Sequence, residues 1–218
     1  MTAAETFVAE MDAKNHTSID RLIGILSAGI AKEGFEVPDV LRLTLKAAIE
    51  GAEVAALWVA DCDDLGAKLV LAEQCGDGAK HYRKIAARLT AIGVDLSAYN
   101  PRDGGYSKLF AFLRSLQTAE ERSSAGHLTL KAMSIARFGT LAAYCEEKGD
   151  AETARLFREQ LVPDEARYYD EGKRALALSA INEESQARAR RAAYRALELV
   201  GESQDPLQLR RAMLKRPR

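Results

Sequence analysis

One pattern extends through almost all of the 218 residues: apolar side chains recur every three to four positions, which is the period of an α-helix. No segment alternates polar and apolar residues over the length of a strand. The chain also contains only five prolines, the residue that helix interiors tolerate least. The sequence therefore predicts an all-α protein.

Glycines, prolines and short acidic turns divide this pattern into separate helices. We expect the first helix to begin at Thr17, with Asp20 three residues on as in a capping box, and to end at Gly34. Pro163 lies inside the last long helical segment, so we expect a kink there. The remaining predicted helices cover residues 38–62, 64–92, 107–116, 118–148, 150–180 and 182–200, followed by a short helix from residue 205.

Four of the predicted helices are long, roughly 37–45 Å each at 1.5 Å per residue. They form two hairpins, which turn at residues 61–64 and 148–150, and residues 93–117 connect them. Thr118, followed by Glu121, and Asp150 are the expected N-caps of the second hairpin. Two hairpins joined by one long crossover are typical of a ferritin-like four-helix bundle. The predicted organisation is an N-terminal helical segment (1–37), the bundle (38–180) and a basic helical extension (181–218).

Composition excludes several classes of function. The 31 Lys and Arg nearly balance the 32 Asp and Glu, so the chain lacks the basic excess that neutralises nucleic-acid phosphates. No apolar run reaches the ~18 residues of a membrane helix, and the N-terminal residues lack the pattern of a secretory signal. The three cysteines are unclustered, which predicts a cytoplasmic protein without a disulfide framework. We therefore expect neither a membrane nor a nucleic-acid partner.

Ionisable residues on the apolar stripes of the long helices are the candidate site residues. A bundle interior holds a charge only when the charge is paired or binds a metal. Glu50 shares a helix face with Ala47, Val54 and Leu57, and Glu53 lies at the adjacent edge as a second choice. Because most glutamates are exposed, a surface position is the alternative for both.

The later helices carry further candidates of the same kind. Glu73, Asp77 and His81 lie four residues apart on one stripe, as metal ligands or as a surface charge pair. His127 and Lys131 lie on a largely apolar helix, where the histidine could be a core residue and the lysine could reach solvent. On the last long helix the candidates are Glu165, Tyr168 and Tyr169, as a polar pair or as a charged face beside a core tyrosine.

Three stretches resemble segments of the ferritin-like di-iron proteins, the superfamily that contains rubrerythrin-like proteins and the tRNA hydroxylases. Residues 73–82 (Glu-Gln-Cys-Gly-Asp-Gly-Ala-Lys-His-Tyr) are similar to its Asp-Glu-Ala-Arg-His segment. Residues 164–169 (Asp-Glu-Ala-Arg-Tyr-Tyr) resemble the second copy of that segment, and Ala-Arg-Phe at 136–138 resembles the helix before this copy. The resemblance covers roughly residues 38–180 and implies a four-helix bundle around two iron ions.

In that superfamily each hairpin supplies one Glu from its first helix and a Glu-x-x-His pair from its second. The resemblance carries three of the six ligands over to this chain, namely Glu50, His81 and Glu165. Gly78 and Lys131 stand where two further glutamates belong, and Tyr168 replaces the second histidine. An ammonium at position 131 would repel a metal cation and would pair with Glu50 and Glu165 instead.

The departures favour, as a first hypothesis, a bundle that has lost the di-iron chemistry and needs no cofactor. Such a protein is either a scaffold subunit, as homodimer or with a partner subunit, or a metal-independent enzyme for a small-molecule substrate. In the enzyme, Lys131 is the candidate base or nucleophile, and Glu165 and Tyr168, with Glu50 nearby, are the candidate acid and base.

Two other functions remain open from the sequence. The first is an iron or manganese oxidoreductase or hydroxylase with a rebuilt site, whose candidate ligands are Glu50, Asp77, His81, His127 and Glu165. The second is an RNA- or protein-binding module, because residues 183–218 carry nine basic against five acidic side chains. A solvated helix packed on the bundle, or a dimer contact, is the alternative for this basic segment.

Overall fold

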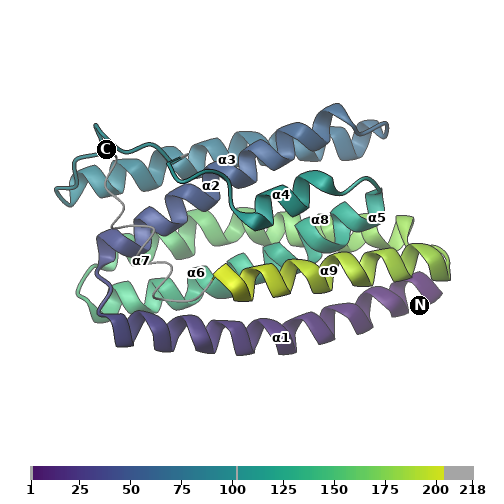
Figure 1. The fold of residues 1–218 in the computed structure, drawn as a ribbon, viewed down its shortest axis with the longest axis horizontal. Helices are drawn as coiled ribbons and strands as arrows, with labels where there is room; N and C mark the ends of the chain where they lie inside the picture. Colours follow the sequence, from purple (N-terminus) through teal and green to yellow (C-terminus); the bar gives the residue numbers. More distant parts are fainter. Residues whose placement is uncertain (1, 102, 204–218) are drawn as a thin grey trace.

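A computed structural model describes residues 2–101 and 103–203. Within these residues the chain is helical with loops between the helices, and it contains no strand, which confirms the all-α prediction. The helices lie side by side along one long direction (Figure 1). Their bounds are α1 Ala3–Glu33, α2 Val37–Ala60, α3 Leu65–Ala91, α4 Lys108–Ser115, α5 Ala119–Arg122, η1 Ser123–Thr129, α6 Leu130–Glu147, α7 Ala151–Arg155, η2 Leu156–Leu161, α8 Val162–Ser179 and α9 Glu183–Ser203.

Both predicted hairpins are present. Helices α2 and α3 turn at residues 61–64, and α4 lies in the crossover that leads to the second hairpin. Thr118 forms the predicted capping box with Glu121, and the Asp150 side chain accepts from the backbone N–H of Thr153 at 2.9 Å. These caps satisfy backbone donors that the first turn of a helix leaves without partners. The loop formers in the sequence therefore place the hairpins correctly.

The first helix begins much earlier than the sequence predicted. Thr2 caps it in a box with Glu5, and Thr17 lies in the helix interior, where its hydroxyl donates to the Ala13 carbonyl. The added turns bury Phe7 and neighbouring apolar residues against α8 and α9. The prediction was wrong because the polar residues near Thr17 face solvent and concealed the apolar stripe that continues on the other face.

Each long helix of the second hairpin contains a π-helical segment that the sequence did not predict. Segment η1 lies between α5 and α6, and η2 lies between α7 and α8. The helix widens in η2, which ends two residues before Pro163, and the predicted kink at the proline stays a prediction. Proline has no backbone N–H to donate within the helix, and its ring clashes with the carbonyl of the preceding turn. A widened turn before it accommodates both the missing hydrogen bond and the ring.

The helices are stacked in layers, and apolar side chains pack between them. Figure 1 shows α2 and α3 along one edge, α1 along the opposite edge, and α6, α8 and α9 between them. Close approach requires glycine at two contacts: a Cβ on Gly172 of α8 would lie 2.3 Å from His127 Cβ, and one on Gly126 would lie 2.5 Å from the Trp58 ring. Both contacts involve η1, so the widened turn is packed tightly on both sides.

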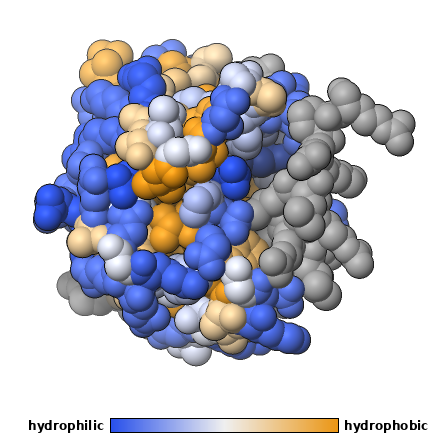
Figure 2. All heavy atoms as spheres, turned by 90° about the vertical axis from the view of Figure 1, so that its left-hand side faces the viewer, coloured by the Kyte–Doolittle hydropathy of each residue, from blue (hydrophilic) through white to orange (hydrophobic). Residues whose placement is uncertain are grey.

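The predicted division into segments 1–37, 38–180 and 181–218 stays a prediction, although α1 and α9 share an apolar cluster with α8 and η1. None of the described helices combines the length and the apolar composition that a bilayer-spanning segment needs. Figure 2 looks onto the end of the molecule where α1 and α6 end and α2 and α7 begin. This end is mostly hydrophilic, with hydrophobic side chains showing at its centre.

Candidate functional site

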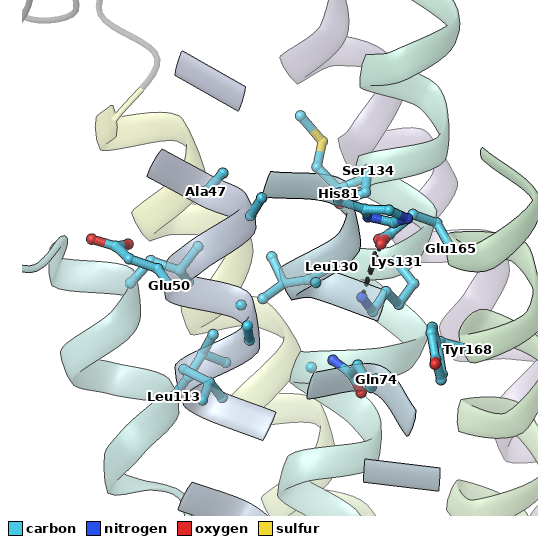
Figure 3. Close-up of a pocket in the computed structure, with 18 of the residues that line it drawn as sticks. Ala47, Glu50, Gln74, His81, Leu113, Leu130, Lys131, Ser134, Glu165 and Tyr168 are labelled. Carbon is cyan, nitrogen blue, oxygen red and sulfur yellow. Dashed lines mark hydrogen bonds and ion pairs between the residues drawn. The ribbon is translucent and has the colours of Figure 1, made fainter. Parts of the chain in front are cut away.

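A cavity of about 180 Å³ lies between the α2–α3 hairpin and the helices α6 and α8. Side chains of α4 and the end of α9 complete its wall. Part of the lining is apolar, and ionisable and polar side chains from α3, α6 and α8 face the same space (Figure 3). The cavity therefore contains most of the candidate residues that the sequence singled out.

The predicted ion pair between Lys131 and Glu165 is present. The lysine Nζ lies 3.2 Å from Oε1 and 3.1 Å from Oε2 of the carboxylate, and the two side chains are only 13% and 9% exposed. Lys131 follows η1 in the first turn of α6, and Glu165 follows η2 in the first turn of α8. Figure 3 shows the pair at the wall of the cavity. Removing one partner of such a shielded ion pair strongly destabilises a protein, because the other charge stays buried without a counter-charge.

Glu50 does not take part in this pair, which corrects the expectation that it would neutralise Lys131. Its carboxylate accepts hydrogen bonds from the N–H of Ser107 at 2.9 Å and from the Ser107 hydroxyl at 2.6 Å. Figure 3 shows Glu50 pointing away from Lys131, toward α4. The reason is a contact with a segment distant in sequence: Ser107 is the N-cap of α4, and a carboxylate near a helix N-terminus is stabilised by the helix dipole.

Asp77 and His81 share one face of α3, as their spacing predicted, and each has a partner on α8. Asp77 Oδ2 accepts from the Tyr168 hydroxyl at 2.7 Å and from Arg167 at 2.5 Å. His81 Nε2 lies 2.9 Å from Asp164 Oδ2. Burial raises the pKa of Asp77, but hydrogen bonds from Lys80 and Tyr168 outweigh it and leave the pKa below its ordinary value. These contacts connect α3 to α8 at one side of the cavity.

Tyr168 is a hydrogen-bond donor in this arrangement. It is almost fully buried, and its ring lies under the cations of Arg167 and Lys131, which are 4.5 and 5.2 Å from the ring centroid. Burial and the hydrogen bond to Asp77 raise the pKa of Tyr168 well above its ordinary value. The phenol therefore keeps its proton at neutral pH, which makes Tyr168 a positioning group rather than a base.

His127 lies on η1 and hydrogen-bonds across the interior to α3. Its Nε2–H donates to Gln74 Oε1 at 2.8 Å, and both side chains are buried. Burial, together with the nearby charge of Lys131, lowers the pKa of His127 to about 4. The imidazole is therefore neutral at neutral pH and acts as a core hydrogen-bonding group, as one of the two interpretations of the sequence had it.

The buried imidazole predicts a pH dependence of stability. Because its folded-state pKa of about 4 lies below the ordinary 6.5, its contribution is complete above pH 6.5 and is lost as the pH falls toward 4. We expect the loss to total about 3 kcal/mol. Urea unfolding across this range measures it, with His127→Gln as the comparison, which we expect to show a flatter dependence. If the unfolding free energy falls with pH equally in both proteins, His127 is not the group that causes the pH dependence.

The donor set does not fit a di-metal centre. Among residues 2–101 and 103–203, no three His, Cys, Asp or Glu side chains are placed to hold one metal ion. A Cβ on Gly78 would lie 2.9 Å from Ala52 Cβ, so the packing of α2 on α3 leaves no room for a glutamate there. Lys131 presents an ammonium where the resemblance places a carboxylate. The five candidate ligands Glu50, Asp77, His81, His127 and Glu165 therefore do not form a ligand set.

Comparisons with models of protein families, with curated proteins and with solved structures found no match to this chain. The ferritin-like assignment consequently rests on helix order and on the quoted motifs. What the cavity does has to be argued from its own residues.

Sequence reasoning missed several polar residues of the cavity, among them Gln74, Ser134 and Arg137. Gln74 follows Glu73 directly and gave no signal as a neutral side chain, and Ser134 is too common a residue type to stand out. Arg137 is the most informative of the three, because its Nε is buried and donates no hydrogen bond. Its spacing of six residues from Lys131 places the two about 120° apart around α6, so helix periodicity gave no signal that both line the cavity.

The basic extension is a packed helix where the structure describes it. Helix α9 buries an alanine- and leucine-rich face against η1 and α1. Arg188 pairs with Glu120 and Glu184, and Arg195 pairs with Glu198. The predicted short helix from residue 205 and the basic tail after it lie outside the described residues, so the RNA- or protein-binding hypothesis stays a prediction.

Proposed function

We propose that this protein is a ferritin-like bundle that works without a metal centre, and that its interior cavity binds a small organic molecule. The observation that carries the proposal is the buried Lys131–Glu165 pair at the cavity wall. In the ferritin-like superfamily this region of a bundle holds a metal between carboxylates. Here the ammonium of Lys131 supplies the positive charge that such a metal would supply.

The surroundings of the pair support a binding site rather than a filled core. A cavity of about 180 Å³ exceeds the size of an engineered apolar cavity that accepts benzene. Proteins of this size close-pack their interiors with few voids larger than a water molecule. A void of this volume beside ionisable groups is therefore the place where a ligand is expected.

The same pair defines what chemistry the site supports. The Lys131 ammonium can donate to an oxygen that gains negative charge, and the Glu165 carboxylate can accept a proton from a bound molecule. At neutral pH Tyr168 stays protonated and His127 stays in its neutral form, so they orient groups rather than exchange protons. This division makes Lys131 and Glu165 the reacting residues of a metal-independent enzyme. If the cavity binds no ligand, the alternative function is that of a scaffold subunit.

Filling the cavity tests the proposal. We expect Ser134→Leu to remove binding of small aromatic and aliphatic probes, measured by thermal shift and calorimetry, while its unfolding temperature changes by only a few degrees. The same protein incubated with Fe²⁺ or Mn²⁺ and desalted should retain well below one equivalent of metal by elemental analysis. About two equivalents of iron, or no bound probe in the unmodified protein, contradict the proposal.

A further inference from the structure

The charge of the cavity lining indicates which ligand the cavity takes, an inference that rests on the proposed function. Three carboxylates line the cavity, and each has a partner within the protein. These partners are Ser107 for Glu50, Tyr168 and Arg167 for Asp77, and Lys131 for Glu165. No carboxylate of the lining is left to pair with a further cation.

Arg137 is such a cation. It lies on α6 in the lining of the cavity, and its Nε is buried without a hydrogen-bond partner. Among the residues that the structure describes, no carboxylate is ion-paired with the Arg137 guanidinium. Glu165 attracts its charge at longer range, but this carboxylate is already paired with Lys131. Nearly all buried polar atoms in proteins are satisfied, so an orphaned guanidinium nitrogen beside a cavity requires an explanation.

A bound anion provides that explanation. Burial lowers the pKa of Arg137, and the charge of Glu165 offsets this only in part, while the residue as a whole is half-buried. A guanidinium presents parallel N–H donors that match the two oxygens of a carboxylate. A ligand carboxylate would satisfy the orphaned Nε–H and neutralise the charge in one contact.

The rest of the lining describes the remainder of the ligand. Ala48, Ala52, Leu130, Met133 and Phe138 give the cavity an apolar wall. A volume of about 180 Å³ holds a body of about six to nine non-hydrogen atoms, by comparison with benzene in a slightly smaller cavity. We propose that the cavity binds a small monocarboxylic acid, with its carboxylate on Arg137 and its apolar body against this wall.

Calorimetric titration of the full chain with matched probes tests the inference. Benzoate and cyclohexanecarboxylate carry the proposed charge, benzamide is a neutral isostere of benzoate, and inorganic phosphate is an anion without an apolar body. We expect the two carboxylates to bind more tightly than benzamide, and phosphate not to bind. Arg137→Gln should weaken benzoate at least about tenfold and leave benzamide unchanged. Arg83→Gln, an exposed change on α3, is the control and should alter neither.

Each outcome has a distinct meaning. If benzamide binds as tightly as benzoate and Ser134→Leu removes both, the cavity function stands and the assignment of Arg137 is wrong. If phosphate binds as tightly as benzoate, the proposal that the ligand has an apolar body is wrong. If no probe binds, both this inference and the proposed function fail. A second readout needs no ligand: Arg137→Gln should unfold at the same or a higher temperature than the unmodified protein, whereas a clear loss of stability would reveal a structural partner for Arg137.

Discussion

Glu165→Ala is expected to destabilise the protein by about 3–5 kcal/mol, because it leaves the ammonium of Lys131 buried without a counter-charge. The cost comes from the uncompensated charge rather than from the lost contact. The double variant Lys131→Met with Glu165→Met should therefore recover most of the loss, since two apolar side chains fill the same space without any charge. Urea unfolding of the two variants and the unmodified protein gives the three free energies.

A matched control is available on the preceding turns of the same helix. Glu159 pairs with Arg155 at 4.0 Å, and both side chains are about two-thirds exposed. Glu159→Ala should cost less than about 1 kcal/mol, because water solvates the remaining charge. If Glu165→Ala costs no more than this control, or if the double variant is as unstable as the single one, Lys131 and Glu165 do not form the shielded pair on which the proposed function depends.

Gly78→Glu should destabilise the protein by about 3 kcal/mol or more. A Cβ at this position meets the Cβ and Cα of Ala52 at 2.9 and 3.2 Å and the Ala48 carbonyl at 3.3 Å. Neither a methyl group nor backbone can move aside as a flexible side chain does, so α2 and α3 must separate. A carboxylate forced into this contact also loses hydration without gaining a partner. Thermal and urea unfolding measure the effect.

Gly76 provides the comparison for this substitution. It lies two residues earlier on α3, it is exposed, and a Cβ there meets nothing within 4 Å. Gly76→Glu should be neutral or stabilise by up to about 1 kcal/mol, because glycine is a poor helix former. Similar unfolding temperatures for the two variants would show that α2 and α3 can accommodate a glutamate at 78. Packing would then not require glycine at the position where the resemblance places a glutamate.

Apart from the start of α1, the helix positions and turns followed from the sequence because they depend on local chemistry. Periodicity and caps such as Asp150 placed both hairpins. The spacing of Asp77 and His81 correctly predicted that they share one face of α3, and the structure shows that this face contacts α8. From the resemblance, Lys131 was expected to pair with Glu50 and Glu165, and its pairing with Glu165 is present.

The remaining features depend on contacts between distant segments. Glu50 was assigned to the interior from its helix face, but the N-cap of α4 lies within reach and competes for its carboxylate. The π segments could not be predicted, because the apolar periodicity of a helix changes little when one extra residue is inserted. Arg137 was visible as a residue, but only the packed structure shows that its Nε has no partner.

The two π segments have a consequence for how this site depends on chain length. A π turn accommodates one more residue than an α turn, so each segment acts as an angular offset for the helix that follows it. Lys131 and Glu165 both lie shortly after such an offset. A change of η1 to α geometry with all its residues kept would rotate Lys131 by roughly 100° about the axis, away from Glu165, and deleting one residue at the same time would cancel this rotation. The meeting of these two side chains is therefore encoded in the number of residues before them as much as in their identity.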